Sequence, residues 1–173
     1  MIGDRWGVTD AEVRLPYPCD LEVPGAQVQA WRGVSVAATP AQVWPWLRQL
    51  RLAPYSYDWV DNLGRRSPRE LRDLPDPQPG EPFTTVAARF DCGRVLSVVP
   101  GEQLTAEILG SVMSYVVTPD GPGSRLLMKL VLPRRRWWST AMVLGDLPMA
   151  RKQLLNLKRL AEGEQPPDGY RSL

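Results

Sequence analysis

The chain has 173 residues, of which 43% are hydrophobic and 23% are charged, a composition that fits one globular domain with a sizeable core. The formal net charge of +2 is too small to indicate a nucleic-acid partner, so we expect none. The sequence contains no histidine, which excludes histidine-dependent catalytic triads and removes the commonest metal ligand. We therefore expect neither a metal nor an organic cofactor.

The cysteines and the apolar segments bear on the cellular compartment. Cys19 and Cys92 have no metal-binding spacing, and they either stay as free thiols or pair with each other. No apolar run approaches the ~20 residues of a membrane span, and residues 1–6 lack the pattern of a signal peptide. These features predict a cytoplasmic protein.

The first 26 residues show no steady hydrophobic period. Leu15-Pro16-Tyr17-Pro18 must be extended, because a residue that precedes a proline is driven out of the helical region. We predict an extended N-terminal arm over residues 1–26, with a partly disordered tail as the alternative. The domain itself should span residues 27–163, followed by a C-terminal tail over residues 164–173.

Aromatic side chains are concentrated in two neighbouring segments, Thr39-Pro40-Ala41-Gln42-Val43-Trp44-Pro45-Trp46-Leu47 and Tyr55-Ser56-Tyr57-Asp58-Trp59. Tyrosine and tryptophan bury large areas and carry a polar group that needs a partner. Such a cluster either fills a core or lines a pocket for an apolar molecule.

The alternation of residues 27–37 predicts a strand. A helix should follow, with Thr39 as its N-cap, Pro40 at its first position and Gln42 completing a capping box. Residues 58–63 are typical of a second short helix. A proline-rich loop should then extend to residue 82.

Short strands with turn signals between them fill the second half of the chain. The expected strands are residues 83–90, 94–99, 103–109, 112–118 and 125–132. The first turn is placed at Asp91-Cys92-Gly93. Connections this short predict an antiparallel meander with one buried face.

A last helical region should begin at Ser139 or Thr140, and residues 149–162 have helical spacing of their apolar side chains. Pro148 either kinks one helix or starts a second. This segment alone is long enough to cover the sheet. The predicted fold is therefore α+β of the helix-grip type, a curved antiparallel sheet around a long C-terminal helix, with two short helices after the first strand.

The element order and several segments resemble the SRPBCC superfamily, which includes START-like lipid-binding domains and polyketide cyclase/dehydrase proteins. The resemblance covers residues 14–162. It is carried by the two aromatic segments, by the Pro119-Asp120-Gly121 turn before Arg125-Leu126, and by residues 149–162 as the closing helix. Pro16-Tyr17-Pro18 is similar to the arm of a bacterial subgroup of that superfamily. The resemblance implies a helix-grip fold with an internal cavity, but no shared catalytic motif.

Three residues are candidates for acid/base chemistry. Asp58 stands among aromatic residues and, if desolvated, would have a raised pKa, with Tyr57 as its hydroxyl partner; alternatively, Asp58 caps a helix. Glu107 stands in the middle of a strand and faces either the interior, as a second acid/base group, or solvent.

The remaining candidates would bind a ligand, with ordinary core packing as the alternative for the apolar ones and an outward side chain as the alternative for the arginine. They are Trp44, Tyr55, Trp59, Arg89, Met113, Tyr115, Met128, Met142 and Met149. Methionines adapt to irregular apolar ligands, tyrosine hydroxyls give direction, and an inward arginine would bind an anionic oxygen. We expect one cavity, with Asp58 at or near its mouth, to be surrounded by Trp44, Tyr55, Tyr57, Trp59, Met142 and Met149.

Arg134-Arg135-Arg136-Trp137-Trp138 is the one clear run of basic residues. It either contacts a membrane surface weakly or forms a solvated loop.

The predicted fold and the resemblance together predict a protein that binds a hydrophobic small molecule, polyketide- or lipid-like, in an internal cavity. Two activities remain open: a cofactor-independent cyclisation or dehydration, and non-catalytic carriage of a lipid or metabolite with docking on membranes.

Overall fold

The computed structural model describes residues 3–132 and 139–163, and for residues 139–146 it describes the helical backbone alone. The elements in chain order are β1 (Arg5–Trp6), α1 (Asp10–Val13), α2 (Cys19–Glu22), β2 (Val28–Val36), α3 (Pro40–Arg48), the 3₁₀ helix η1 (Gln49–Leu52), α4 (Asp58–Asp61), β3 (Pro82–Val86), β4 (Phe90–Val99), β5 (Gln103–Ile108), β6 (Ser111–Asp120), β7 (Gly123–Leu132) and α5 (Ser139–Ala161). The predicted α+β class is confirmed.

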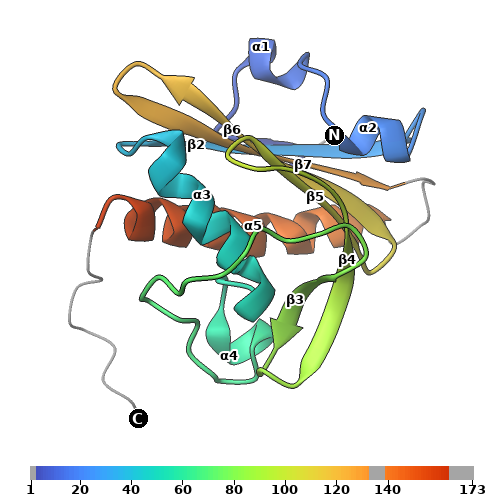
Figure 1. Ribbon diagram of the computed structural model, residues 1–173. Coiled ribbons are helices and arrows are strands. Elements are labelled where there is room, and N and C mark those ends of the chain that lie inside the picture. Colours follow the sequence, from blue (N-terminus) through green and yellow to red (C-terminus); the bar gives the residue numbers. More distant parts are fainter. Residues whose placement is uncertain (1–2, 133–138, 164–173) are drawn as a thin grey trace.

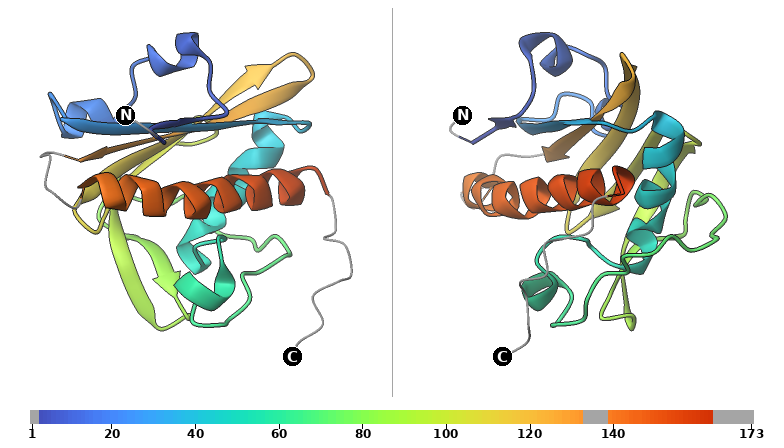
Figure 2. Two further views of the ribbon diagram at one scale, coloured as in Figure 1. Left: turned by 180° about the vertical axis from the view of Figure 1, so that it is seen from behind. Right: turned by 90° about the vertical axis from the view of Figure 1, so that its left-hand side faces the viewer.

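One seven-stranded sheet forms the body of the molecule, with the strand order β1-β2-β7-β6-β5-β4-β3. The sheet is curved, and α5 lies along its concave face while α3 and α4 lie toward one end (Figures 1 and 2). This arrangement confirms the helix-grip prediction. The sheet is not wholly antiparallel, however, because β1 from the N-terminal arm pairs with β2 in parallel.

The start of the domain follows the sequence pattern closely. β2 pairs along its whole length with β7, from Val28 opposite Leu132 to Val36 opposite Ser124. In the capping box before α3, the backbone N–H of Thr39 donates to Gln42 Oε1 at 2.9 Å.

The first hairpin of the meander turns at residues 87–89, not at the predicted Asp91-Cys92-Gly93. Ala87 and Ala88 carry the turn with φ values of 52° and 53°, a conformation that alanine rarely adopts and that the sequence does not signal. Gly93 lies inside β4, where a Cβ atom would come within 2.4 Å of the Glu107 carbonyl oxygen. The glycine therefore permits a close approach of β5 and does not mark a turn.

α5 is one continuous helix of 23 residues with Pro148 inside it. Of the two predicted alternatives, Pro148 therefore lies within one helix and does not start a second. Leu154 and Leu157 on this helix are fully buried in the core that also contains the concave face of the sheet. No helix within residues 3–132 and 139–163 is long and apolar enough to cross a membrane.

The N-terminal segment covers the opposite, convex face of the sheet (Figures 1 and 2). It is not simply extended, because it contains the short helices α1 and α2. Tyr17 and Cys19 pack there in a second apolar cluster with Leu127 and Val131. The segment thus covers the part of the convex face that β2, β6 and β7 form.

Candidate functional site

A cavity of about 560 Å³ lies between the concave face of the sheet, α4 and α5. Most of its lining is apolar, and these residues are Leu50, Pro54, Phe83, Val86, Ile108, Leu109, Met113, Met128, Leu130, Leu132, Met149 and Ala150. The polar lining residues are Ser56, Asp61, Thr84, Cys92, Ser111, Tyr115 and Gln153. Its size and composition are those of sites that hold small organic ligands.

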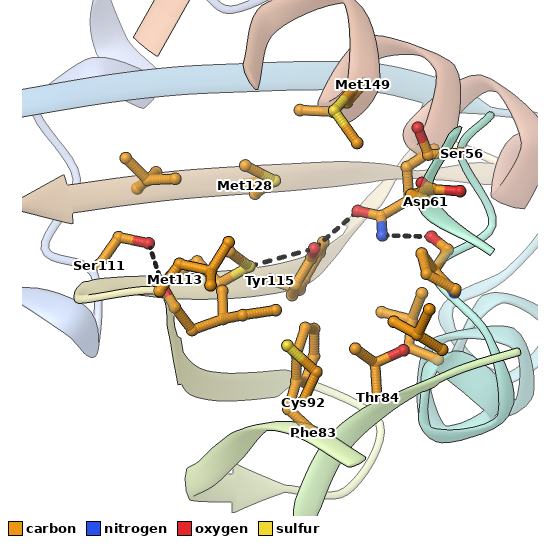
Figure 3. Close-up of a pocket in the computed structure, with 18 of the residues that line it drawn as sticks. Ser56, Asp61, Phe83, Thr84, Cys92, Ser111, Met113, Tyr115, Met128 and Met149 are labelled. Atoms are coloured by element: carbon orange, nitrogen blue, oxygen red, sulfur yellow. Dashed lines mark hydrogen bonds between the residues drawn. The ribbon is translucent and has the colours of Figure 1, made fainter. Parts of the chain in front are cut away.

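A chain of hydrogen bonds crosses one side of the cavity (Figure 3). The Tyr115 hydroxyl on β6 donates to Gln153 Oε1 on α5 at 2.6 Å, and Gln153 Nε2 donates to the Pro54 carbonyl oxygen at 2.6 Å. The Tyr115 ring also stacks on Phe83, with 6.1 Å between the ring centroids. These contacts join sheet, helix and the segment before α4, and they hold the cavity wall in one geometry.

The segment that leads into α4 is held by further polar side chains. Asn156 Nδ2 of α5 donates to the carbonyl oxygen of Tyr55 at 2.9 Å. Tyr55 has a φ of 58°, and its hydroxyl accepts a hydrogen bond from Gln49 Nε2 at 2.6 Å. Anchoring of this strained turn places Ser56 and Asp61 at the cavity.

Asp61 is the carboxylate of the cavity. Both its side-chain oxygens are shielded from solvent, and neither accepts a hydrogen bond of good geometry from a residue that the structure describes. Burial raises the pKa of the Asp61 carboxyl above its usual value; the Ser56 hydroxyl opposes the rise, and the negative charge of Asp58 adds to it. Asp61 is therefore equipped to exchange a proton or to accept hydrogen bonds from a ligand.

Two hydroxyl groups in the lining share this lack of partners. Ser56 and Thr84 are only 6% and 3% exposed, and neither hydroxyl oxygen forms a hydrogen bond of good geometry within the described part of the chain. In Figure 3, Ser56 and Asp61 lie together at one end of the cavity, with Thr84 on the same side. Unpaired polar atoms are thus gathered at one end.

The cavity reaches the surface at the turn between β5 and β6. Leu109 lines the cavity and is 78% exposed, so an apolar ligand can enter beside it. Cys92 also lines the cavity, whereas Cys19 is buried under the arm, and both thiols are free. The disulfide left open by the sequence is therefore not formed.

Four of the sequence-predicted ligand-binding residues lie in the cavity lining, namely Met113, Tyr115, Met128 and Met149. Three come from adjacent strands and the fourth from α5. Their contact with a ligand stays a prediction.

The expectation that the aromatic cluster surrounds the cavity is wrong. Trp44 is buried in the core, and its indole Nε1 donates to Asp76 Oδ1 at 2.7 Å. Tyr55 is also buried, and burial raises its pKa to about 12. Trp59 is 74% exposed on the outer side of α4. Two of these aromatics pack in the core and one faces solvent, so none lines the cavity.

Asp58 does not line the cavity either. Its carboxylate accepts a hydrogen bond from Ser67 Oγ at 2.6 Å, and Asp58 lies in the first turn of α4, where Tyr57 takes the N-cap position. Tyr57 does not line the cavity. The catalytic role proposed from the sequence for Asp58 and Tyr57 therefore has no geometric support, because the α4 carboxylate that reaches the cavity is Asp61.

The two charged strand candidates face outward. Glu107 is about half exposed and forms an ion pair with Arg94 at 3.3 Å. Arg89 is exposed in the turn between β3 and β4. The solvent-facing alternative therefore holds for both. The side chain of Met142 and all of residues 134–138 lie outside the described residues.

Sequence reasoning missed six of the seven polar cavity residues, namely Ser56, Asp61, Thr84, Cys92, Ser111 and Gln153. Asp61 follows Asp58 by three positions, so the two share one side of a helix. This spacing is the sequence feature that could have made Asp61 a candidate once Asp58 was one. The described residues contain no group of three or more histidine, cysteine, aspartate or glutamate residues that could hold a metal ion.

Comparison with known proteins gives likenesses at the level of structure. No protein-family model matches the sequence, and no curated protein is similar to it at a significant level. The structure resembles protein MLL2253 of Mesorhizobium loti, with a TM-score of 0.53, 17% identity, and coverage of 80% of this chain and 100% of that one. Protein NE0264 of Nitrosomonas europaea gives a TM-score of 0.52, 14% identity, and coverage of 80% and 96%.

An AHSA1-like protein of Rhizobium etli gives a TM-score of 0.50 at 18% identity, with coverage of 84% of this chain and 91% of that one. Identities this low establish a shared fold and leave ligand and activity open. The likeness extends over nearly the whole of each solved structure. The chain therefore has the helix-grip fold that the sequence predicts, and it shares this fold with these solved structures.

Proposed function

We propose that the protein binds a hydrophobic small molecule, polyketide- or lipid-like, in the cavity between the sheet and α5. One observation carries the proposal: a cavity of about 560 Å³ has a mainly apolar lining with a few polar groups gathered at one end. An apolar ligand in such a space gains free energy by leaving water, and the polar end fixes its orientation.

The test places a larger side chain in the cavity. Ala150 lines the cavity on α5, and Ala150→Phe puts a ring into that space. We expect the variant to lose most of the binding of N-phenyl-1-naphthylamine, an uncharged apolar fluorophore, in a fluorescence titration. Native mass spectrometry of the wild-type protein should also show a copurified small molecule, and the variant should lack it.

Ala41→Phe is the matched control, because Ala41 is an exposed residue of α3 outside the cavity. It makes the same chemical change and should leave probe binding unaltered. Equal binding by wild type and both variants would show that the fluorophore does not use the cavity and would contradict the proposal. Thermal unfolding of each variant establishes that it is folded.

A second candidate is a cyclisation or dehydration of the bound molecule. The observation that favours it is Asp61, a carboxyl with a raised pKa in an apolar cavity. The cavity would confine a flexible substrate, and Asp61 would hold or accept the proton. Once a substrate is found, Asp61→Asn should abolish turnover, and retained turnover would leave binding as the function.

The non-catalytic alternative is a lipid or metabolite carrier that docks on membranes through residues 134–138. The cavity alone suffices for carriage, since no proton transfer is needed. We also propose that the protein is located in the cytoplasm.

A further inference from the structure

The polar end of the cavity contains more unpaired acceptors than the fold requires. Asp61 Oδ1 and Oδ2, Ser56 Oγ and Thr84 Oγ1 are all shielded from solvent, and none forms a hydrogen bond of good geometry within the described part of the chain, although the Ser56 hydroxyl lies close enough to Asp61 to act on its pKa. Leaving a buried polar atom unpaired is unfavourable, because the hydrogen bonds that it made to water are not replaced. Native proteins rarely accept several such losses in one place unless another molecule pairs the atoms.

The side-chain amides of Asn156 and Gln153, which lie near this end of the cavity, form hydrogen bonds with atoms other than the Asp61 and Ser56 side-chain oxygens. Asn156 Nδ2 donates to the carbonyl oxygens of Tyr55 and Ser56, and the Gln153 amide is engaged by Tyr115 and Pro54. These contacts fix the backbone that presents Ser56 and leave its hydroxyl and the Asp61 carboxylate directed to the cavity. The fold therefore holds these polar groups in place but does not supply their hydrogen-bond partners.

The charges around this end have one sign. None of the described cavity-lining residues is a lysine or an arginine, and Asp58 adds a second carboxylate near Asp61. An anionic head group, such as that of a fatty acid, would meet like charge in a poorly solvated place. A head group that is positively charged and rich in N–H donors would pair with the carboxylate and the hydroxyl together.

We propose that Asp61 and Ser56 select hydrophobic ligands that carry a protonated amine, with the ammonium group at this end and the apolar body along the rest of the cavity. This inference rests on the proposed binding function. Figure 3 shows the space for the body: Met113 lies away from Asp61 and Ser56, with Met128 on the neighbouring strand β7 between them. Methionine side chains adjust to apolar chains of varied shape.

The experiment compares decylamine, decan-1-ol and decanoic acid, three probes with the same hydrocarbon chain and different head groups. Their affinities for the intact protein are measured by isothermal titration calorimetry near neutral pH and at constant ionic strength. We expect decylamine to bind about tenfold more tightly than decan-1-ol, which is the effect of one charge-assisted hydrogen-bonded pair, and decanoic acid to bind least.

Asp61→Asn should remove this preference, because the amide has nearly the same shape and no charge. Decylamine affinity should fall about tenfold, and decan-1-ol affinity should stay nearly constant. Asp58→Asn is the control, since Asp58 is in the same helix but outside the cavity lining, and it should keep most of the preference for the amine. Thermal unfolding verifies that both variants are folded.

The wild-type ranking can overturn the inference without any variant. Equal affinities for the three probes, or tightest binding of decanoic acid, would refute amine selection while leaving hydrophobic binding intact. If the Asp61→Asn variant still prefers decylamine, a group other than Asp61 must cause the preference, and the inference is refuted. If no probe binds and N-phenyl-1-naphthylamine does not bind either, the proposed function fails along with the inference.

Discussion

Two aspartates on one short helix have different environments. Asp58 is paired with Ser67 at 2.6 Å outside the cavity, whereas Asp61, three positions later, lines it without a partner among the described residues. Side chains at this spacing lie on the same side of a helix, so the sequence does not distinguish them. The anchoring of the preceding turn by Gln49 and Asn156 determines which of the two reaches the interior.

The raised pKa of Asp61 predicts a pH-dependent stability. Well below the ordinary aspartate pKa of about 3.9, the carboxyl is protonated in the unfolded chain as well as in the folded one, so burial costs little. As the pH rises from there through the raised folded-state value, the unfolded chain loses its proton more readily, and stability falls. Asp61→Asn lacks this penalty, so its melting temperature should exceed that of the wild type by an amount that grows as the pH rises from the unfolded-state pKa through the raised folded-state pKa and is constant above it.

Asp73→Asn provides the control, because Asp73 is exposed in the long loop. Its melting temperature should differ from that of the wild type by the same small amount at every pH. A constant difference for Asp61→Asn would mean that the Asp61 carboxyl is not destabilised by burial.

At the scale of elements, α4 and the β3–β4 hairpin form one unit beside the cavity. Asn62, which follows α4, accepts a hydrogen bond from the backbone N–H of Ala87 in the turn, with a distance of 2.7 Å to Oδ1. The turn itself is strained, since Ala87 and Ala88 both have positive φ values. A non-glycine residue in this conformation costs about 1–2 kcal/mol.

Ala88→Gly should therefore stabilise the protein. Relief of the strain exceeds the extra entropy of glycine in the unfolded chain, and we expect a gain of about 0.5–1 kcal/mol in the free energy of unfolding, measured by urea denaturation. Ala41→Gly is the matched control, because Ala41 is exposed in α3 and the same substitution there should cost about 1 kcal/mol. A loss of stability in both variants would show that the turn is unstrained.

At the scale of the whole molecule, the concave face of the sheet and part of its convex face are covered. α5 and the cavity occupy the concave face, while the N-terminal arm covers the convex one (Figures 1 and 2). Lys129 illustrates how closely the arm packs: it is only 4% exposed, and its ammonium group pairs with Asp20 of α2 at 2.5 Å. The arm therefore belongs to the folded unit and does not restrict access to the cavity.

The basic residues 134–136 give a test of membrane docking at this scale. If they contact a membrane, the wild-type protein should sediment with anionic liposomes and not with neutral ones, and added salt should weaken the effect. Replacing Arg134, Arg135 and Arg136 together by serine should remove the sedimentation. The same replacement of Arg65, Arg66 and Arg69, which are exposed elsewhere, is the control. Equal sedimentation of both triple variants would reject a specific role for the segment.

The sequence was sufficient for features that depend on local pattern. Alternation along β2, the capping box at Thr39 and the short spacing of the meander each predicted an element that the structure contains. The turn at Ala87 and Ala88 escaped prediction because it uses residues without a turn signal, and Gly93 misled because its freedom serves a strand contact.

By itself, the sequence determined the helix-grip architecture and the placing of Met113 and Tyr115 on one strand face, because strand periodicity decides which side chains share a face. Only the tertiary structure decided which carboxylate enters the cavity and which aromatics do not. Those outcomes depend on packing between segments far apart in the chain. Asn156 holding Tyr55, and Tyr115 holding Gln153, are contacts of this kind, and no local pattern encodes them.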